Sequence, residues 1–307
     1  MLTIAILFRN MARMTPDCVQ ILADSLRTLY LDRTHAEVIF VDDASDPGQE
    51  VTPMLMQLRQ AFPVLVRILR FKTRQHYTRG LAHVLSSAKG HVLFVSHDML
   101  VPRSYIRGIL EVAAMDDAFG IVRGVSTYVD VFPQHIVEPP GGVGNLQQLN
   151  GFADFVAARW GLTCVEDEFL TGDSMLIKRQ VIEKIGVFDS KFFGYYGDID
   201  YGLRAQRAGF KLVCAKGAWL FHQGAGFYQN ESQRTGQPYE QIHAARMKVV
   251  EAAYQVFREK WASASPIPAD YRGTAEMQLA KLRAAPTGPG NYEAPLGAVT
   301  AEVGEWL

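Results

Sequence analysis

The amino-terminal part of the chain alternates short apolar runs with segments in which apolar residues recur every three or four positions. The apolar runs are rich in β-branched and aromatic residues and predict strands at 3–8, 37–41, 66–71 and 91–95. Helices are predicted between these runs: one after Pro16, one over 53–62, one over 79–88 and one that begins at Pro102. Because the runs are apolar on both faces, they indicate buried strands of a mostly parallel sheet flanked by helices, an α/β fold.

The middle of the chain departs from this alternation. Residues 131–164 contain several prolines and glycines, and we expect an irregular insertion there. Regular structure is predicted to return in short segments, with strands at 174–177, 211–214 and 218–221 and helices at 180–185 and 199–208.

A long amphipathic helix is predicted over 240–261. Its apolar face carries Ile242, Val249 and Phe257, and its polar face mixes acidic with basic residues instead of the basic excess of membrane-surface helices. We therefore expect this helix to pack on its own domain or on a second subunit of a homo-oligomer. Residues 263–307 are rich in Ala, Pro and Gly without periodicity, and predict an extension that is loosely ordered or used for association.

Composition and charge narrow the classes of protein to which the chain can belong. The 307 residues are 48% hydrophobic, enough for a large buried core, and carry 31 basic against 32 acidic side chains. That balance argues against nucleic acid as a partner, because counterion release needs a basic face. Three distant cysteines predict neither a disulfide framework nor a zinc site. No run approaches the roughly 20 apolar residues of a transmembrane segment, so we expect a cytoplasmic protein, at most peripheral at a membrane.

The sequence lacks the defining motifs of several common classes of α/β enzyme. The first strand ends in Arg9, Asn10 and Met11, without the glycine-rich turn of the dinucleotide fingerprint. Neither a Walker P-loop nor a nucleophile elbow of the form G-x-S-x-G occurs. Dinucleotide binding, Walker-type hydrolysis and α/β-hydrolase chemistry therefore lose their main support.

Carboxylates follow the predicted strands at several points. Asp42 and Asp43 end the second strand, Asp98 follows the fourth, Asp198 opens a helix and His222 ends a later strand. In an open parallel sheet the carboxyl ends of the strands form the ligand-binding edge. Acidic residues at that edge suit a hard divalent cation that holds a diphosphate, and a further carboxylate can take a proton from an attacking hydroxyl.

The same segments resemble, in order, the motifs of family 2 glycosyltransferases with the GT-A fold. V-D-D-A-S at 41–45 resembles the nucleotide-binding motif, and 71–90, with His76 and Arg79, resembles a run of rhamnosyltransferase-like members. F-V-S-H-D at 94–98 stands where the family carries its D-x-D element. The acceptor-side blocks and the terminal metal histidine are matched by 172–179, 188–193, 197–210 and His222. The resemblance extends from residue 3 to residue 227.

For the donor, this resemblance implies a binding site for a nucleotide-diphosphate sugar. Asp42 and Asp43 would contact the base or ribose, and Arg9, His76 and Arg79 would complete the donor site. A guanidinium suits a diphosphate because it offers forked donors. The donor would be a dTDP-, UDP- or GDP-sugar.

For catalysis, the resemblance implies that Asp98 and His222 hold Mn²⁺ or Mg²⁺ against the diphosphate. Asp198 would be the general base that deprotonates an acceptor hydroxyl, and a single displacement of this kind inverts the anomeric carbon. Residues 1–126 would form the nucleotide-sugar-binding half and 127–262 the acceptor-side half of one GT-A domain. The acceptor would be a glycan, a lipid-linked glycan or a small molecule, as in polysaccharide biosynthesis.

Three positions depart from the family pattern. Ser96 occupies the first position of D-x-D, Gly197 replaces a glutamate and Gly80 replaces an asparagine. Two other functions therefore stay open: a sugar nucleotidyltransferase, and a domain that binds a sugar nucleotide without catalysis. The nucleotidyltransferase would normally show a glycine-rich loop after the first strand, and 9–15 has no glycine.

Overall fold

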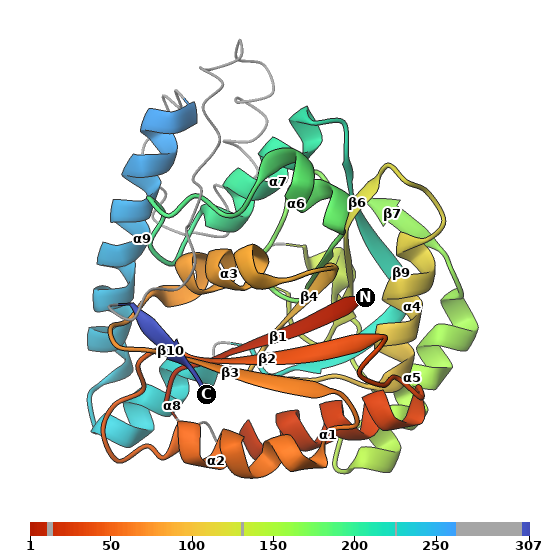
Figure 1. The fold of residues 1–307 in the computed structure, drawn as a ribbon, viewed down its shortest axis with the longest axis horizontal. Helices are drawn as coiled ribbons and strands as arrows, with labels where there is room; N and C mark the ends of the chain where they lie inside the picture. Colours follow the sequence, from red (N-terminus) through yellow and green to blue (C-terminus); the bar gives the residue numbers. More distant parts are fainter. Residues whose placement is uncertain (11–14, 130–131, 225, 262–302) are drawn as a thin grey trace.

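The computed structural model describes residues 1–10, 15–129, 132–224, 226–261 and 303–307. Among these residues the strands form one ten-stranded sheet (Figure 1). Its centre is parallel: β1 (Leu2–Phe8) lies between β2 (Ala36–Asp42) and β4 (His91–Ser96), and β3 (Leu65–Phe71) follows β2. The parallel core predicted from the apolar runs is therefore confirmed.

Beyond β4 the sheet continues with mixed strand directions. β8 (Met175–Ile177) runs antiparallel to β4 and to β6 (Phe119–Ser126), and β9 (Lys211–His222) runs parallel to β6. The short strands β5 (Met99–Leu100) and β7 (Cys164–Glu166) both pair with β9. The end of β9 therefore meets the segment that follows β4.

Helices cover both faces of the sheet because its strands are apolar on both faces. In β1, Ile4 and Ile6 belong to the apolar layer on one face, and Ala5 and Leu7 belong to the layer on the other. The first layer is covered by α1 (Thr15–Thr28), α2 (Val51–Leu58) and α4 (Arg103–Ala113). The second is covered by α3 (His76–Ser87), α6 (Arg179–Ile185) and α7 (Gly197–Arg207).

Two expectations about regular structure are wrong, and the strand β6 (Phe119–Ser126) was not predicted. The segment expected to be an irregular insertion contains a short 3-10 helix (Pro133–His135) and α5 (Leu146–Trp160), whose apolar residues pack on β9. Asn145 caps α5, because its side chain accepts the N–H of Gln148 at 2.9 Å. The two strands expected between 211 and 221 are the single strand β9.

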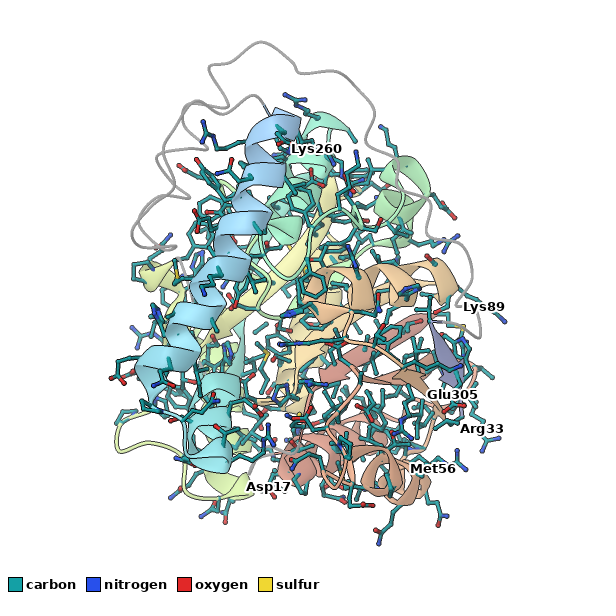
Figure 2. The ribbon with its side chains drawn as sticks, turned by 90° about the vertical axis from the view of Figure 1, so that its left-hand side faces the viewer. Asp17, Arg33, Met56, Lys89, Lys260 and Glu305 are labelled. Carbon is teal, nitrogen blue, oxygen red and sulfur yellow. The ribbon has the colours of Figure 1, made fainter. Side chains whose placement is uncertain are left out.

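The long helix α9 (Tyr239–Trp261) packs within the same chain. Tyr254 and Phe257 contact Tyr196, just before α7, in one apolar cluster. Lys260, near the end of α9 (Figure 2), lies 2.8 Å from the buried carboxylate of Asp200. The carboxyl-terminal part of the apolar face is thus covered within the chain, and oligomerisation through this helix stays a prediction. No helix in the described part of the chain is long and apolar enough to cross a membrane.

The end of the chain adds a strand to the sheet. Most of the extension predicted over 263–307 lies outside the described residues, but β10 (Gly304–Trp306) pairs antiparallel with β3. The Arg67 guanidinium lies 3.9 Å from the ring centroid of Trp306, and this ring packs against the second apolar layer. β10 therefore covers an edge strand that would otherwise present unpaired backbone groups.

We predict that Trp306→Ala lowers the free energy of unfolding by about 1–2 kcal/mol, because a cation–π contact and buried apolar area are lost together. Urea denaturation followed by circular dichroism measures the change. Glu305→Ala is the matched control on the same strand, since Glu305 is exposed and should shift the midpoint little. Equal effects of the two substitutions would show that β10 is not anchored by Trp306.

Candidate active site

Asp42, at the carboxyl end of β2, shapes the turn that follows the strand. It is 2% exposed. Its Oδ1 accepts the N–H of Ser45 at 2.9 Å, and its Oδ2 accepts the hydroxyl of Thr52 at 2.6 Å. Both carboxylate oxygens are engaged inside the chain, so the contact between Asp42 and a nucleotide stays a prediction.

Asp43 connects β2 to the start of α3. Its carboxylate accepts the N–H of Gln75 at 2.5 Å and the N–H of His76 at 3.0 Å. Burial raises the pKa of Asp43, and these N–H groups and two arginines oppose that effect. The bonds use donors that the first turn of a helix leaves without partners. Asp43 is therefore the residue that fixes the amino end of α3 to the sheet.

Arg9 and Asn10 follow β1 and contact the loop after β2. Arg9 donates to the backbone carbonyl of Asp43 at 3.1 Å and to the carboxylate of Asp46 at 2.7 Å. The side chain of Asn10 accepts the N–H of Asp46 at 2.8 Å and donates to its carboxylate at 3.1 Å. The loops after β1 and β2 are thus tied together by polar contacts.

The helix α8 (Gly226–Thr235) reaches the same two loops. Asn10 donates to Glu231 at 2.8 Å, and Arg234 donates to Asp46 at 2.9 Å. Arg234 also pairs with Glu231 at 2.7 Å. The carboxyl ends of β1 and β2 are therefore joined to α8, far along the chain.

His76 and Arg79 contact the loop between α6 and α7. The ring of His76 packs edge-on against Phe193, with centroids 4.3 Å apart. Arg79 Nε donates to the carbonyl of Ser190 at 2.8 Å. Burial and the neighbouring arginines lower the pKa of His76 to about 3, so its ring is neutral at pH 7. Because Arg79 holds this loop, its role at a diphosphate stays a prediction.

Asp98 and His222 meet where β5 pairs with the end of β9. Asp98 Oδ1 is buried, forms no hydrogen bond with the described residues, and lies 3.5 Å from His222 Nε2. His222 Nδ1 lies 2.9 Å from the carbonyl of Tyr128, which makes Nδ1 the donor and turns Nε2 toward Asp98. Burial opposes the ionisation of Asp98, but His222, His97 and the Ser96 hydroxyl together outweigh it and hold its pKa below the usual range.

Asp198 lies in the first turn of α7 and is 8% exposed. Its Oδ1 accepts the N–H of Ile199 at 3.0 Å. A Cβ built on Gly172 would lie 2.9 Å from Asp198 Oδ2 and 2.8 Å from the Tyr77 hydroxyl oxygen, so these two side chains flank one glycine. Burial raises the pKa of Asp198 to about 7, although backbone N–H groups favour the carboxylate.

Tyr77 is a site residue that the sequence did not reveal. Its hydroxyl is buried and forms no hydrogen bond within the described part of the chain. It comes from α3, whereas Asp198 comes from α7. Residues on two different helices are therefore brought together beside Gly172.

Arg123 of β6, also not predicted, holds the segment on which Asp198 rests. It is 3% exposed, and its guanidinium donates to the Thr171 hydroxyl and, at 3.3 Å, to the carboxylate of Asp173. Burial disfavours the charge of Arg123, but Asp173, Asp167 and the other groups around it together outweigh burial and raise its pKa. Both partners flank Gly172, so Arg123 fixes the glycine that contacts Asp198.

Gly197, which stands where the family pattern has a glutamate, packs directly on α3. A Cβ at this position would lie 2.4 Å from Thr78 Cγ2 and 2.5 Å from Thr78 Oγ1. No side chain fits there without moving Thr78. This close approach sets the start of α7, and with it Asp198, against α3.

His135, Asp167 and Cys214 form a separate buried group of metal-ligand types. Their ligand atoms lie within 4.8 Å of one another. His135 Nε2 is 2.7 Å from Asp167 Oδ1, and Lys216 Nζ is 3.2 Å from His135 Nδ1. An imidazole that accepts from a lysine at Nδ1 is protonated at Nε2, so neither nitrogen is available to a cation. We interpret this group as a buried polar network.

A cavity of about 320 Å³ lies beside the donor-side residues. The residues that line it include Arg74, His76, Tyr195, Glu231 and Arg246. It is bordered by the start of α3, by α8 and by α9. Because His76 is held by Asp43, the cavity adjoins the loop that follows β2.

The structure thus gathers most of the predicted residues into three groups at the carboxyl ends of the strands. They are Arg9 with Asp42, Asp43 and His76, then Asp98 with His222, and Asp198, which lies beside the unpredicted Tyr77. Arg79 is drawn away from the first group toward Ser190.

Comparison with known proteins identifies one matching family model and several solved structures with a similar fold. Residues 12–248 match the model of a glycosyltransferase like family 2. A search of curated proteins finds no match. The fold is similar to GalNAc-T7 with UDP, GalNAc and Mn²⁺, at a TM-score of 0.52 and 12% identity, over 72% of this chain and 42% of that chain.

Two further structures match over more of their length. The mannosyltransferase PcManGT from Pyrobaculum calidifontis, in complex with GDP-Man and Mn²⁺, has a TM-score of 0.50 and 16% identity, over 92% of this chain and 80% of that chain. S. aureus TarS 1–349 has a TM-score of 0.50 and 13% identity, over 92% of this chain and 78% of that chain. At such identities these likenesses show the fold. Because the family model matches most of the chain, the protein belongs to the glycosyltransferase-like family 2, and its α/β sheet is a GT-A fold.

Proposed function

We propose that the protein transfers a sugar from a nucleotide-diphosphate donor to an acceptor hydroxyl, with Asp198 as the general base. The observation that carries this proposal is the state of Asp198, a carboxylate that is 8% exposed and whose pKa burial raises to about 7. A base with a pKa near the working pH is ionised often enough to act and basic enough to accept a proton from a hydroxyl.

The donor site is supported by the cationic groups near Asp43. Arg9 contacts the loop after β2, and Arg74 lines the adjoining cavity with His76. Guanidinium groups suit the oxygens of a diphosphate because they donate in pairs. Two structures of the same fold contain UDP or GDP-Man. We therefore infer that a dTDP-, UDP- or GDP-sugar binds at this edge.

Asp98 and His222 fit a divalent cation. The Asp98 Oδ1 atom is buried without a hydrogen-bond partner in the described structure, as expected for an oxygen that contacts a ligand from outside the chain. The Tyr128 carbonyl fixes the imidazole tautomer, as carbonyls do behind metal-binding histidines. Mn²⁺ is present in GalNAc-T7 and PcManGT. When bound, Mn²⁺ or Mg²⁺ would neutralise charge that develops on the departing diphosphate.

In the proposed reaction, one proton passes from the acceptor hydroxyl to a carboxylate of the chain. Asp198 Oδ2, which faces Gly172, accepts the proton of the acceptor hydroxyl as that oxygen bonds to the anomeric carbon. The bond between this carbon and the diphosphate oxygen breaks, and its electron pair leaves with the diphosphate. Attack from the opposite face gives an inverted glycoside. The Tyr77 hydroxyl orients the acceptor from the other side of Gly172.

The two halves of the domain divide this work. We assign donor binding to 1–126 and acceptor binding to 127–262, since Arg9 and Asp43 lie in the first and Asp198 in the second. The acceptor that we propose is a glycan, a lipid-linked glycan or a small molecule, as in polysaccharide biosynthesis.

Asp198→Asn should lower the transfer rate by at least about a hundredfold, because the amide cannot accept the proton. Donor binding should persist. The measurements are turnover of a panel of dTDP-, UDP- and GDP-sugars, and calorimetry with UDP, GDP and dTDP in Mn²⁺. Asp117→Asn, at an exposed carboxylate, is the control. Nucleotide binding without turnover of any donor by the wild type would instead favour a non-catalytic domain.

The rate of transfer should fall about tenfold per pH unit below pH 7. The sign follows from the raised pKa of about 7: as the pH falls through this value, Asp198 becomes protonated and can no longer act as a base. Initial rates between pH 5 and 8.5, at saturating donor, would locate the acid limb. A limb near pH 4, the range of an ordinary carboxylate, would contradict this role for Asp198.

Asp98→Asn and His222→Gln should each weaken the binding of nucleotide diphosphate in Mn²⁺ at least tenfold, because each removes one of two ligands. In EDTA, their nucleotide affinity should equal that of the wild type. Calorimetry with UDP and GDP separates the two conditions. His35→Gln, on an exposed histidine, is the control. Unchanged affinity in Mn²⁺ would remove Asp98 and His222 from the cation site.

A further inference from the structure

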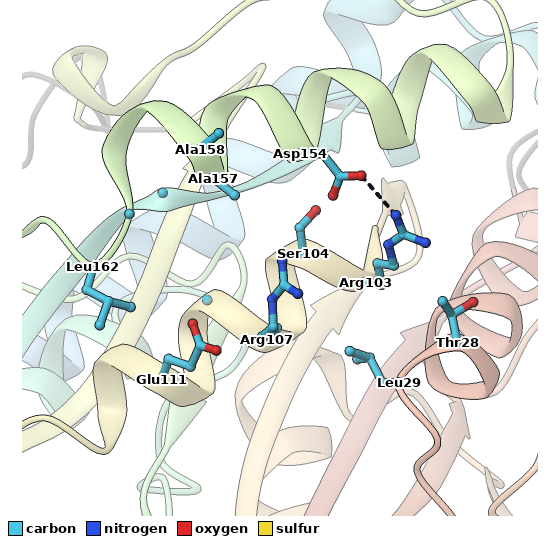
Figure 3. A pocket seen from close by; sticks show the side chains of 13 residues that line it. Thr28, Leu29, Arg103, Ser104, Arg107, Glu111, Asp154, Ala157, Ala158 and Leu162 are labelled. Carbon is cyan, nitrogen blue, oxygen red and sulfur yellow. Dashed lines mark hydrogen bonds and ion pairs between the residues drawn. The ribbon is translucent and has the colours of Figure 1, made fainter.

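A second cavity, of about 640 Å³, lies between α4 and α5 (Figure 3). Thr28 and Leu29, at the carboxyl end of α1, also line it. Helices that join parallel strands run back to the amino ends of those strands. The cavity therefore extends away from the edge that carries Asp43 and Asp198, and no residue of the candidate active site lines it.

The charged side chains of this cavity balance. Arg103 of α4 and Asp154 of α5 both line the cavity and form an ion pair at 3.0 Å. Arg107 and Glu111, one helical turn apart on α4, both line the cavity and are exposed. Neither side chain forms a hydrogen bond or an ion pair within the part of the chain that the structure describes. Two guanidinium groups thus face two carboxylates.

Ser104 adds a polar atom that lacks a partner. Its side chain is 2% exposed, and its Oγ forms no hydrogen bond with the described residues. Figure 3 shows this hydroxyl directed from α4 toward α5 and Asp154. A buried hydroxyl without a partner costs free energy, and a ligand hydroxyl in the cavity would satisfy it.

The floor of the cavity is made of small residues. Gly108, Ala157, Ala158, Gly161 and Gly217 leave the space open, and Leu162, 45% exposed, forms an apolar edge. A Cβ on Gly217 would lie 2.1 Å from the carbonyl of Gly161, so β9 and the end of α5 approach closely there. The cavity is therefore bounded by closely packed backbone at this point.

This combination selects a neutral polyhydroxylated ligand over an ion. A simple anion would be repelled by Asp154 and Glu111, and a simple cation by Arg103 and Arg107. Sugar hydroxyls both donate and accept, so they suit carboxylates, guanidinium groups and the Ser104 hydroxyl at once. The volume lies within the roughly 300–1,000 Å³ of small-ligand sites. We propose that this cavity binds a neutral saccharide, part of the acceptor glycan remote from the reacting hydroxyl.

The proposal rests on the proposed function only in naming the acceptor as the source of the saccharide. Binding at the cavity requires neither donor nor transfer. Saturation-transfer NMR and calorimetry with methyl glycosides of common hexoses, their disaccharides and inorganic phosphate test it directly on the full chain.

Four variants locate the binding. Ala158→Trp fills the cavity and Arg107→Gln removes a donor, and each should weaken saccharide binding at least tenfold. Gln147→Trp, exposed on α5 outside the cavity, and Asp198→Asn, in the candidate active site, should leave binding unchanged. Loss of transfer in Asp198→Asn with saccharide binding intact separates the two proposals.

Three outcomes would overturn the inference. The first is that no saccharide of the panel binds the wild type. The second is that binding is equal in the wild type and both cavity variants. The third is that phosphate binds more tightly than every saccharide and is lost in Arg107→Gln, which would make this an anion site.

Discussion

The hydrogen bonds that the backbone N–H groups at the start of α3 donate to Asp43 are the constraint on which the site depends. They hold His76 at a φ of 57°, a backbone conformation uncommon for residues other than glycine, and so fix how α3 leaves the sheet edge. Two residues on, Thr78 packs on Gly197, which opens the helix that carries Asp198. The carboxylate of Asp43 therefore helps to position both His76 at the start of α3 and Asp198 at the start of α7.

The surroundings of each carboxylate give it a different role. Asp43 is occupied by backbone N–H groups, Asp98 is kept ionised by His222 and a hydroxyl, and Asp198 is desolvated with a pKa of about 7. An ionised carboxylate suits a cation, and one with a raised pKa suits proton transfer, so the roles we propose for Asp98 and Asp198 follow from their different surroundings. The formal net charge of −1 conceals this local contrast.

The apolar runs of the sequence predicted the parallel strands, and the acidic residues that follow these runs predicted the carboxylates at the strand ends. The helix over 146–160 was missed although Leu149 and Val156 recur at helical spacing, because the prolines and glycines before it dominate the composition. β6 was missed because two glycines and an arginine interrupt its apolar run. The network of Arg123 joins Asp173, 50 residues later, and no local signal shows such a contact. Pairings of this kind depend on the assembled sheet.

The structure shows what surrounds Gly197 and Ser96, two of the positions that depart from the family pattern. At 197 the space of a glutamate side chain is taken by Thr78, so glycine there allows α3 and α7 to approach closely. At 96 the serine hydroxyl supports the ionised form of Asp98. Losing one carboxylate nevertheless leaves Asp98 and His222 as the proposed protein ligands, fewer than a divalent cation requires. Phosphate oxygens of the donor would have to complete the coordination. This would couple cation binding to nucleotide binding, and it would allow a locally anionic site to accept a diphosphate.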